Sequence, residues 1–182
     1  MKKNNIVQFE CFETAIGFDE FVSRWEFYAK RFTGKDADVT LQQAIVKGRF
    51  KYVSQHKWPE DNFQFDFMKG RNSINFPDRN VKVIQAGGYM PLQAEHIHDT
   101  DSDDVKVFLF INNQQTDISF YKQLPSYRHL NIYQSYYENC LYAYIMEFFV
   151  EEMHVADFLA PVKLLSAGAE TGVYKECLVL TN

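Results

Sequence analysis

The sequence has 182 residues, of which 46% are hydrophobic and 16% aromatic, and its formal net charge is −5. This composition supports a large apolar core and excludes a disordered chain. The lack of a basic stripe excludes a nucleic-acid-binding surface, and no apolar stretch approaches the ~20 residues of a membrane span. We therefore expect a soluble globular protein that binds neither nucleic acid nor membrane.

The start of the chain and its cysteines both favour a cytoplasmic protein. Residues 1–5 are polar and lack the apolar run of a signal peptide. Cys11, Cys140 and Cys177 are far apart and odd in number. This spacing is typical of buried thiols in a reducing compartment rather than of a disulfide framework.

The first 92 residues predict a β-α-β-β-α-β unit. Val7, Phe9 and Cys11 alternate with polar residues, as in a strand, and the following apolar residues recur every three or four positions, as in a helix. The predicted elements are a strand over 7–11, a helix over 18–32, two strands within 41–58 joined near 47–49, a short helix over 59–67, a loop over 69–80 and a strand over 81–90. Gly87-Gly88 near the end of the last strand is expected to be a bulge or the strand end.

The acidic stretch 93–104 is expected to be an exposed linker, because it is polar and carries several carboxylates. A second unit over 105–182 repeats the order of strands and helices without repeating the residues. Its predicted elements are a strand over 105–111, a short helix capped by Asp117 and stopped at Pro125, strands over 132–137 and 141–150, a helix over 155–165 with a kink at Pro161, and a strand over 173–180.

The strand over 141–150 is apolar on both faces, and this indicates how the two units pack. A ferredoxin-like sheet covers one face with its two helices and leaves the other bare, whereas a strand with two apolar faces needs both buried. We therefore expect an α+β fold of two tandem ferredoxin-like units whose antiparallel sheets pack face to face as an intrachain α/β barrel. Ala143, Ile145 and Phe149, or their strand neighbours, are expected to be buried between the sheets.

Two segments resemble the dimeric α/β-barrel superfamily, and within it the antibiotic-biosynthesis-monooxygenase-like proteins. Residues 54–63 (SQHKWPEDNF) are similar to the family's strand-to-helix junction, where a Trp is followed by acidic residues and a Phe. Residues 154–163 (HVADFLAPVK) are similar to the second helix of such a unit. Family members typically carry one unit per chain and dimerise, so the resemblance implies a fused pair here, and association of fused pairs into a homo-oligomer stays open.

The resemblance implies cofactor-free oxygenation of aromatic substrates, haem degradation, isomerisation or simple ligand binding. The haem-degrading branch pairs the junction Trp with a His about one helix length later and with an Asn on the first strand. Trp58 matches the Trp, but 66–69 contains no His and the first strand has no Asn in its middle. We therefore expect no haem and no other cofactor.

One predicted strand face carries the residues best suited to chemistry. A His that titrates near neutral pH beside an aromatic side chain can hold and deprotonate a phenolic substrate. We expect His56 to be the catalytic base and Tyr52 its hydrogen-bonding partner, with Trp58, Ser54 and Phe63 binding the substrate. The alternative is a half-buried histidine satisfied by one hydrogen bond.

Two further groups of residues have alternative interpretations. His96 and His98, with Asp99 and Asp101, form the most metal-like cluster, but a flexible linker lacks the preorganised geometry of metal ligands, so we expect no metal site. The Tyr-rich stretch 127–137 lines an aromatic pocket or forms sheet surface with its hydroxyls in water.

Two functions follow as hypotheses. The first is a small-molecule enzyme that resembles the cofactor-independent monooxygenases and acts on an aromatic or polyketide-type substrate in the first unit. The second is a non-catalytic ligand-binding or stress-related protein on the same scaffold. Polar groups that converge in a pocket favour the enzyme, whereas a filled apolar interior favours the second hypothesis.

Overall fold

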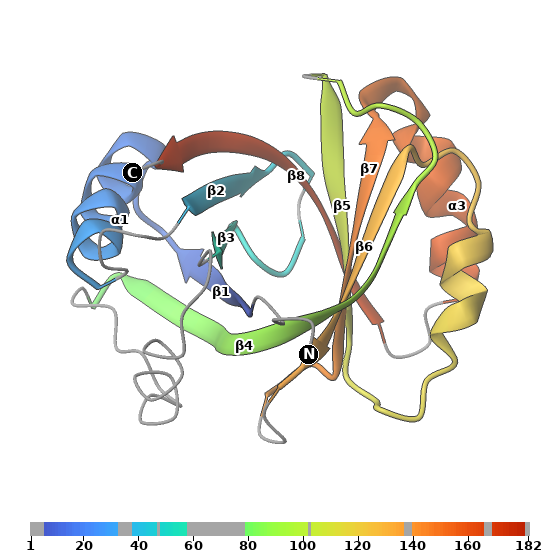
Figure 1. Ribbon diagram of the computed structural model, residues 1–182. Helices are drawn as coiled ribbons and strands as arrows, with labels where there is room; N and C mark the ends of the chain where they lie inside the picture. The colour runs from blue at the N-terminus through green and yellow to red at the C-terminus, as the bar shows by residue number, and fades with distance from the viewer. Residues whose placement is uncertain are drawn as a thin grey trace.

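A computed structural model describes residues 6–32, 38–46, 48–57, 79–101, 103–136, 140–165 and 169–180. Its antiparallel strands close into a barrel with helices outside, which confirms the predicted α+β barrel (Figure 1). The strands are β1 (Val7–Thr14), β2 (Asp38–Ala44), β3 (Tyr52–Lys57), β4 (Val81–His96), β5 (Asp104–Ile111), β6 (His129–Ser135), β7 (Tyr144–Glu151) and β8 (Ala169–Leu180). The helices are α1 (Phe18–Phe32), the 3₁₀ helices η1 (Ile118–Gln123) and η2 (Glu152–His154), and α3 (Val155–Leu165).

The strand order around the barrel is β1-β3-β2-β8-β5-β7-β6-β4, and β4 closes on β1. The first half of the chain contributes β4-β1-β3-β2 and the second half β8-β5-β7-β6, so both halves have the same internal order. The two long strands join the halves, because β4 pairs with β1 and β6 while β8 pairs with β2 and β5. In Figure 1 they form the two curved ribbons that connect the left and right sides of the molecule. A closed barrel leaves no unpaired sheet edge.

Strand β4 corrects two predictions. It runs through His96, so residues 93–96 of the expected linker pair with β6 as part of a strand, although Gln93, Ala94 and His96 are exposed as predicted. Gly87 lies in the middle of this strand rather than near its end. A Cβ atom there would lie 2.8 Å from the Cys140 Sγ, and the close approach of that side chain explains the glycine. The helix predicted over 59–67 lies outside the described residues.

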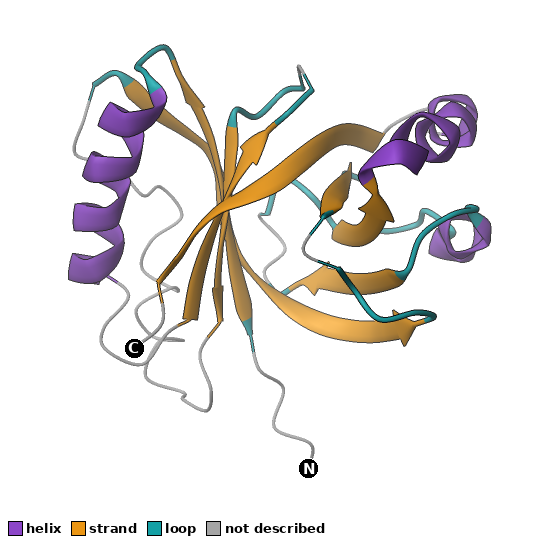
Figure 2. Ribbon diagram, turned by 90° about the horizontal axis from the view of Figure 1, so that it is seen from above, coloured by secondary structure: helices purple, strands orange, loops and turns teal. Residues whose placement is uncertain are grey.

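Helix α1 packs its apolar stripe against the first-half sheet, as its periodicity predicts. Phe21, Trp25 and Ala29 are fully buried and contact Phe12 and Tyr52 of the sheet. On the opposite side of the barrel, α3 and η1 cover the second-half sheet (Figures 1 and 2). Asp117 caps η1 by accepting a hydrogen bond from the Ser119 N–H, as predicted. No helix in the described part of the chain is long and apolar enough to cross a membrane.

Strand β7 has two buried faces, which confirms the observation that predicted the barrel. Met146 and Phe148 lie in the cluster beneath α3, whereas Ile145 lies in the cluster that fills the barrel. Ala143 is buried as expected, but Phe149 is only half-buried.

Candidate functional site

Strands β1 and β3 place four polar side chains on the sheet face that turns toward α1. In the register of this pair, Gln8 lies opposite His56 and Glu10 lies opposite Ser54. Because side chains alternate along a strand, they share this face with residues that pack against α1. Glu10, Ser54 and His56 are each 1% exposed or less. Buried polar groups of this kind need partners, and these side chains supply them to one another.

The contacts centre on the Glu10 carboxylate, and we call Gln8, Glu10, Ser54 and His56 the β1/β3 polar cluster. Glu10 Oε2 lies 3.2 Å from His56 Nε2, and Gln8 Nε2 donates to Glu10 Oε1 at 2.7 Å. The Ser54 hydroxyl lies 3.1 Å from His56 Nε2 and 3.3 Å from Glu10 Oε2. A carboxylate beside Nε2 favours the tautomer with the proton on that nitrogen. Nδ1 is then the basic atom of His56.

The predicted site residues are distributed differently from the expectation. Ser54 and His56 lie together, but the Tyr52 ring stacks on Phe21 with centroids 4.0 Å apart. The buried Tyr52 hydroxyl has no hydrogen-bond partner among the residues that the structure describes, so it does not hold His56. Trp58 and Phe63 lie outside the described residues. Glu10 takes the position beside His56 that we expected for Tyr52.

Glu10 and Gln8 were not among the residues predicted from the sequence. Their alternation with Val7 and Phe9 places them on the face opposite the barrel interior, where a Gln and a Glu on a strand most often contact water. The pattern gives the face but not what covers it, so their burial could not be predicted.

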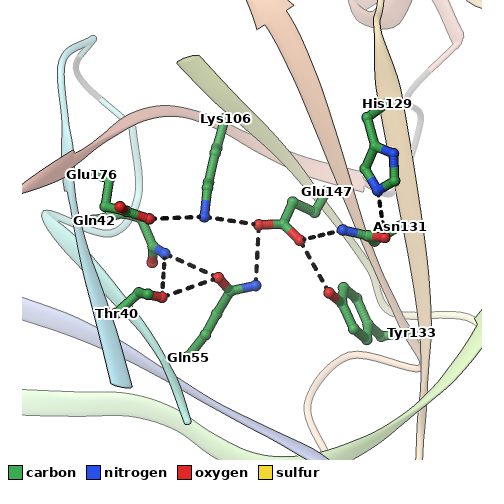
Figure 3. Close-up of polar contacts among 9 residues, drawn as sticks. All are labelled: Thr40, Gln42, Gln55, Lys106, His129, Asn131, Tyr133, Glu147 and Glu176. Atoms are coloured by element: carbon green, nitrogen blue, oxygen red, sulfur yellow. Dashed lines mark hydrogen bonds and ion pairs between the residues drawn. The ribbon is translucent and has the colours of Figure 1, made fainter. Parts of the chain in front are cut away.

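A second polar cluster lies inside the barrel and surrounds Glu147 (Figure 3). The carboxylate is fully buried and lies 3.3 Å from Lys106 Nζ. It also accepts hydrogen bonds from Gln55 at 3.2 Å, Asn131 at 2.9 Å and the Tyr133 hydroxyl at 3.0 Å. We call these side chains the barrel cluster. It has enough donors to satisfy a buried charge.

Electrostatics keep both members of the central ion pair charged. Burial alone would raise the pKa of Glu147, but the positive charges of Lys106 and Lys57, with the hydrogen bonds from Asn131 and Tyr133, hold it below its ordinary value. Burial likewise opposes the charge of Lys106, yet Glu147 and Glu176 raise the pKa of that ammonium. The barrel cluster therefore holds a salt bridge in the barrel at neutral pH.

Aromatic side chains fill the interior beyond this cluster. The Phe9 ring makes edge-to-face contacts with Tyr133 at 5.0 Å and with Tyr89 at 5.5 Å, and Phe50 meets Phe110 at 5.1 Å. Burial raises the pKa of both Tyr89 and Tyr133 well above the ordinary value. These rings pack as a core, so the barrel interior lined by the described residues is filled rather than open.

A groove of about 720 Å³ opens between the end of β4, the η1–β6 connection and the end of β7. Arg128 in its wall forms ion pairs with Glu151 and Asp104 and donates to the Asp99 carbonyl. Ser126 has φ of 66°, a left-handed conformation that is uncommon for a residue with a side chain. The charged groups of the groove are largely paired with one another, which gives it no clear preference for the charge of a ligand.

The metal-like cluster is also arranged differently from the expectation. His96 contacts His129 on the neighbouring strand and Asp99 rather than His98. In the described ranges, no three His, Cys, Asp or Glu side chains converge as metal ligands. Of the thiols, Cys11 is buried, and burial raises its pKa well above the ordinary value.

Solved structures of other proteins share this fold at low sequence identity. An anthrone oxidase-like protein superposes with a TM-score of 0.65 at 11% identity, over 98% of this chain and 94% of its own. A proposed monooxygenase from Fusobacterium nucleatum subsp. nucleatum superposes with a TM-score of 0.57 at 12% identity, over 100% of this chain and 96% of its own. A mutant chlorite dismutase from Candidatus Nitrospira defluvii, in complex with cyanide, superposes with a TM-score of 0.57 at 10% identity, over 96% of this chain and 92% of its own. The chain has the dimeric α/β-barrel fold.

Sequence comparison does not assign the chain to a family within this fold. No family model matches it, and no curated protein matches it. Identities this low show the fold and leave the function to the residues of the site.

The described residues do not fit haem binding beneath α3 of this dimeric α/β barrel. The surface there is formed by buried apolar side chains, among them Leu130, Met146, Phe148 and Phe158, and of the described histidines only His56, in the first half, is buried. In the first half, the position expected for a haem-ligating His falls within 66–69, which lies outside the described residues and contains no His.

Proposed function

We propose that this chain binds a small aromatic molecule at the β1/β3 polar cluster and oxidises it with O₂ without a cofactor, using His56 as the base. One observation carries the proposal. A carboxylate, an imidazole and a hydroxyl converge, nearly inaccessible to water, on a sheet face whose counterpart in the second half is apolar. Polar groups are costly to bury, and packing α1 against the sheet does not require them.

The chemistry begins with a proton transfer to His56 Nδ1. Glu10 holds the Nε2–H and stabilises the imidazolium that forms, as a carboxylate does beside a catalytic histidine. The proton comes from a phenol or from the activated CH₂ of an anthrone-type ring, and the electron-rich anion then reduces O₂. In the net reaction the CH₂ becomes C=O, one oxygen atom enters the product, and the other leaves as water with the two hydrogens.

Other parts of the proposal rest on the sequence. Trp58 and Phe63 follow the cluster along the chain and are proposed to supply the aromatic side of the substrate site. We propose that the site belongs to a first unit over 1–92, followed by a second unit over 105–182. The described cysteines form no disulfide with one another, which supports a cytoplasmic location.

The second candidate function, ligand binding without catalysis, is favoured by the enclosure of the cluster. His56 is 1% exposed, and the interior of the barrel is filled. A substrate therefore reaches Nδ1 only after neighbouring side chains move. An enzyme must repeat this movement in every turnover, whereas a binding protein need not repeat it.

Oxygen uptake with anthrone as the substrate tests the proposal. We expect wild-type protein to consume O₂, His56→Asn to lose about 100-fold in rate, and Glu10→Gln to lose less. His98→Asn is the matched control because His98 lies outside the cluster, and its rate should equal that of wild type. Binding of anthrone without oxygen uptake would support the second function, and neither binding nor uptake would overturn both.

A further inference from the structure

The barrel cluster reaches a pair of histidines at one end of the barrel. His96 of β4 and His129 of β6 are direct cross-strand partners, although 33 residues separate them in the sequence. Their Nδ1 atoms lie 3.0 Å apart, and their rings meet edge to face. Neither residue belongs to the β1/β3 polar cluster, so this pair is independent of the proposed oxidation.

The outer contacts of both rings favour the tautomer with hydrogen on Nε2. His96 Nε2 lies 3.3 Å from Asp99 Oδ1, and His129 Nε2 lies 2.9 Å from Asn131 Oδ1. The Asn131 amide orients its Nδ2 toward the Glu147 carboxylate, which directs its Oδ1 toward His129 (Figure 3). Both Nε2 atoms therefore face acceptors and carry hydrogens.

It follows that the two Nδ1 lone pairs point at each other. At 3.0 Å this arrangement is repulsive unless a cation lies between the nitrogens. Metal-binding histidines commonly donate their outer N–H to a carboxylate or carbonyl oxygen, as His96 and His129 do. We infer that His96 and His129 form a two-histidine site for a late first-row divalent metal ion such as Ni(II) or Cu(II).

The spacing of the nitrogens selects among metals. With metal–nitrogen bonds of about 2.0–2.1 Å, a 3.0 Å separation corresponds to a nitrogen–metal–nitrogen angle of about 95°. This angle suits adjacent positions of a square-planar or octahedral site better than a tetrahedral one, which favours Cu(II) and Ni(II) over zinc. The His96 side chain is 57% exposed, so water can fill the other coordination positions.

The proposal revises the expectation of no metal site. That expectation considered His96 with His98 in a flexible linker. In the structure His96 belongs to a strand, and its partner His129 comes from the second half of the chain. Strand pairing provides the rigid geometry that a linker lacks.

Titration calorimetry with Ni(II) on the tag-free full chain tests the site. We expect one Ni(II) per chain, with at least tenfold weaker binding in His96→Ala and in His129→Ala. Asp99→Ala, which removes an outer acceptor, should weaken binding by about tenfold. His98→Ala is the matched control and should bind as wild type does. Circular dichroism checks that each variant is folded.

Two results would overturn the proposal. One is a Ni(II) titration in which wild type does not bind, in which His96→Ala and His129→Ala both bind as wild type does, or in which His98→Ala loses binding. The other is a nitrogen-15 imidazole spectrum in which one ring of the pair carries two protons at neutral pH and Ni(II) does not displace the shared proton. In that case a proton, not a metal, occupies the space between the rings.

Discussion

The helix-facing surfaces of the two halves share one strand order and differ in chemistry. The second and fourth residues of β1 and their partners on β3 are polar, whereas the same positions of β5 and their partners on β7 are apolar. They are Gln8, Glu10, His56 and Ser54 in the first half and Val105, Val107, Val150 and Phe148 in the second. The second half shows that apolar packing alone can hold a helix on this sheet. The polar residues of the first half therefore call for an explanation beyond stability.

The largest expected loss of stability comes from a substitution on the apolar helix-facing surface of the second half. Phe148→Ala should lower the free energy of unfolding by about 3–5 kcal/mol, because Phe148 is fully buried against Phe158 and Tyr127 and its removal leaves a cavity. Urea unfolding measures the change. A loss below about 1 kcal/mol would mean that this surface is not the tightly packed half of the comparison.

A substitution in the barrel cluster, which lies between the two surfaces, should cause the next largest loss of stability. Glu147→Gln should cost about 2–3 kcal/mol, since it removes the main partner of Lys106 while Glu176 still contacts that ammonium. Because the pKa of Glu147 is lowered on folding, its stabilising effect is complete above the ordinary Glu pKa and is lost as pH falls through the lower folded value. The gap in stability between wild type and Glu147→Gln should therefore narrow as the solution is acidified below that ordinary value. A gap that widens on acidification would contradict this account of the cluster.

A smaller effect is expected when the first-half surface is given the residues of the second. His56→Val alone should cost about 1–3 kcal/mol, because it leaves the buried Glu10 without its imidazole partner. The double variant Glu10→Val, His56→Val should recover most of this loss, since replacing both partners of a buried polar contact with apolar side chains can be nearly neutral. Thermal unfolding of the three proteins tests the comparison. A double variant less stable than the single one would show that the polar cluster supports the fold.

Tyr52→Phe should have the smallest effect. The Tyr52 hydroxyl is buried without a hydrogen-bond partner in the described part of the chain, so its removal should change stability by less than about 1 kcal/mol. Tyr133→Phe is the matched comparison, because its hydroxyl donates to Glu147 and should cost about 1–2 kcal/mol. Equal losses in the two variants would mean that Tyr52 has a polar role that its packing against Phe21 does not show.

The sequence predicted the architecture because local periodicity reports burial. The helical spacing of α1 and the two apolar faces of β7 were enough to expect facing sheets and a barrel. Interactions between distant segments were not predictable. The continuation of β4 to His96 depends on pairing with β6, and the His96–His129 contact depends on that register.

The candidate site was likewise predictable only in part. Ser54 and His56 were identified because they share a strand face, but Glu10 was not, since one strand's alternation cannot show which strand lies beside it. Glu147 was counted within an apolar strand, and its burial depends on Lys106 of the neighbouring β5. Polar residues become a cluster only through pairing, and pairing is a property of the whole fold.

The most direct test of the proposed site is a backbone amide NMR titration with anthrone under nitrogen, where binding occurs without oxidation. The account predicts that chemical shifts change in β1 and β3, over 7–14 and 52–57, while β7 and α3, over 144–151 and 155–165, stay unchanged. Shift changes confined to β7 and α3 would place the ligand on the apolar surface and contradict the assignment of the β1/β3 polar cluster as the reactive site.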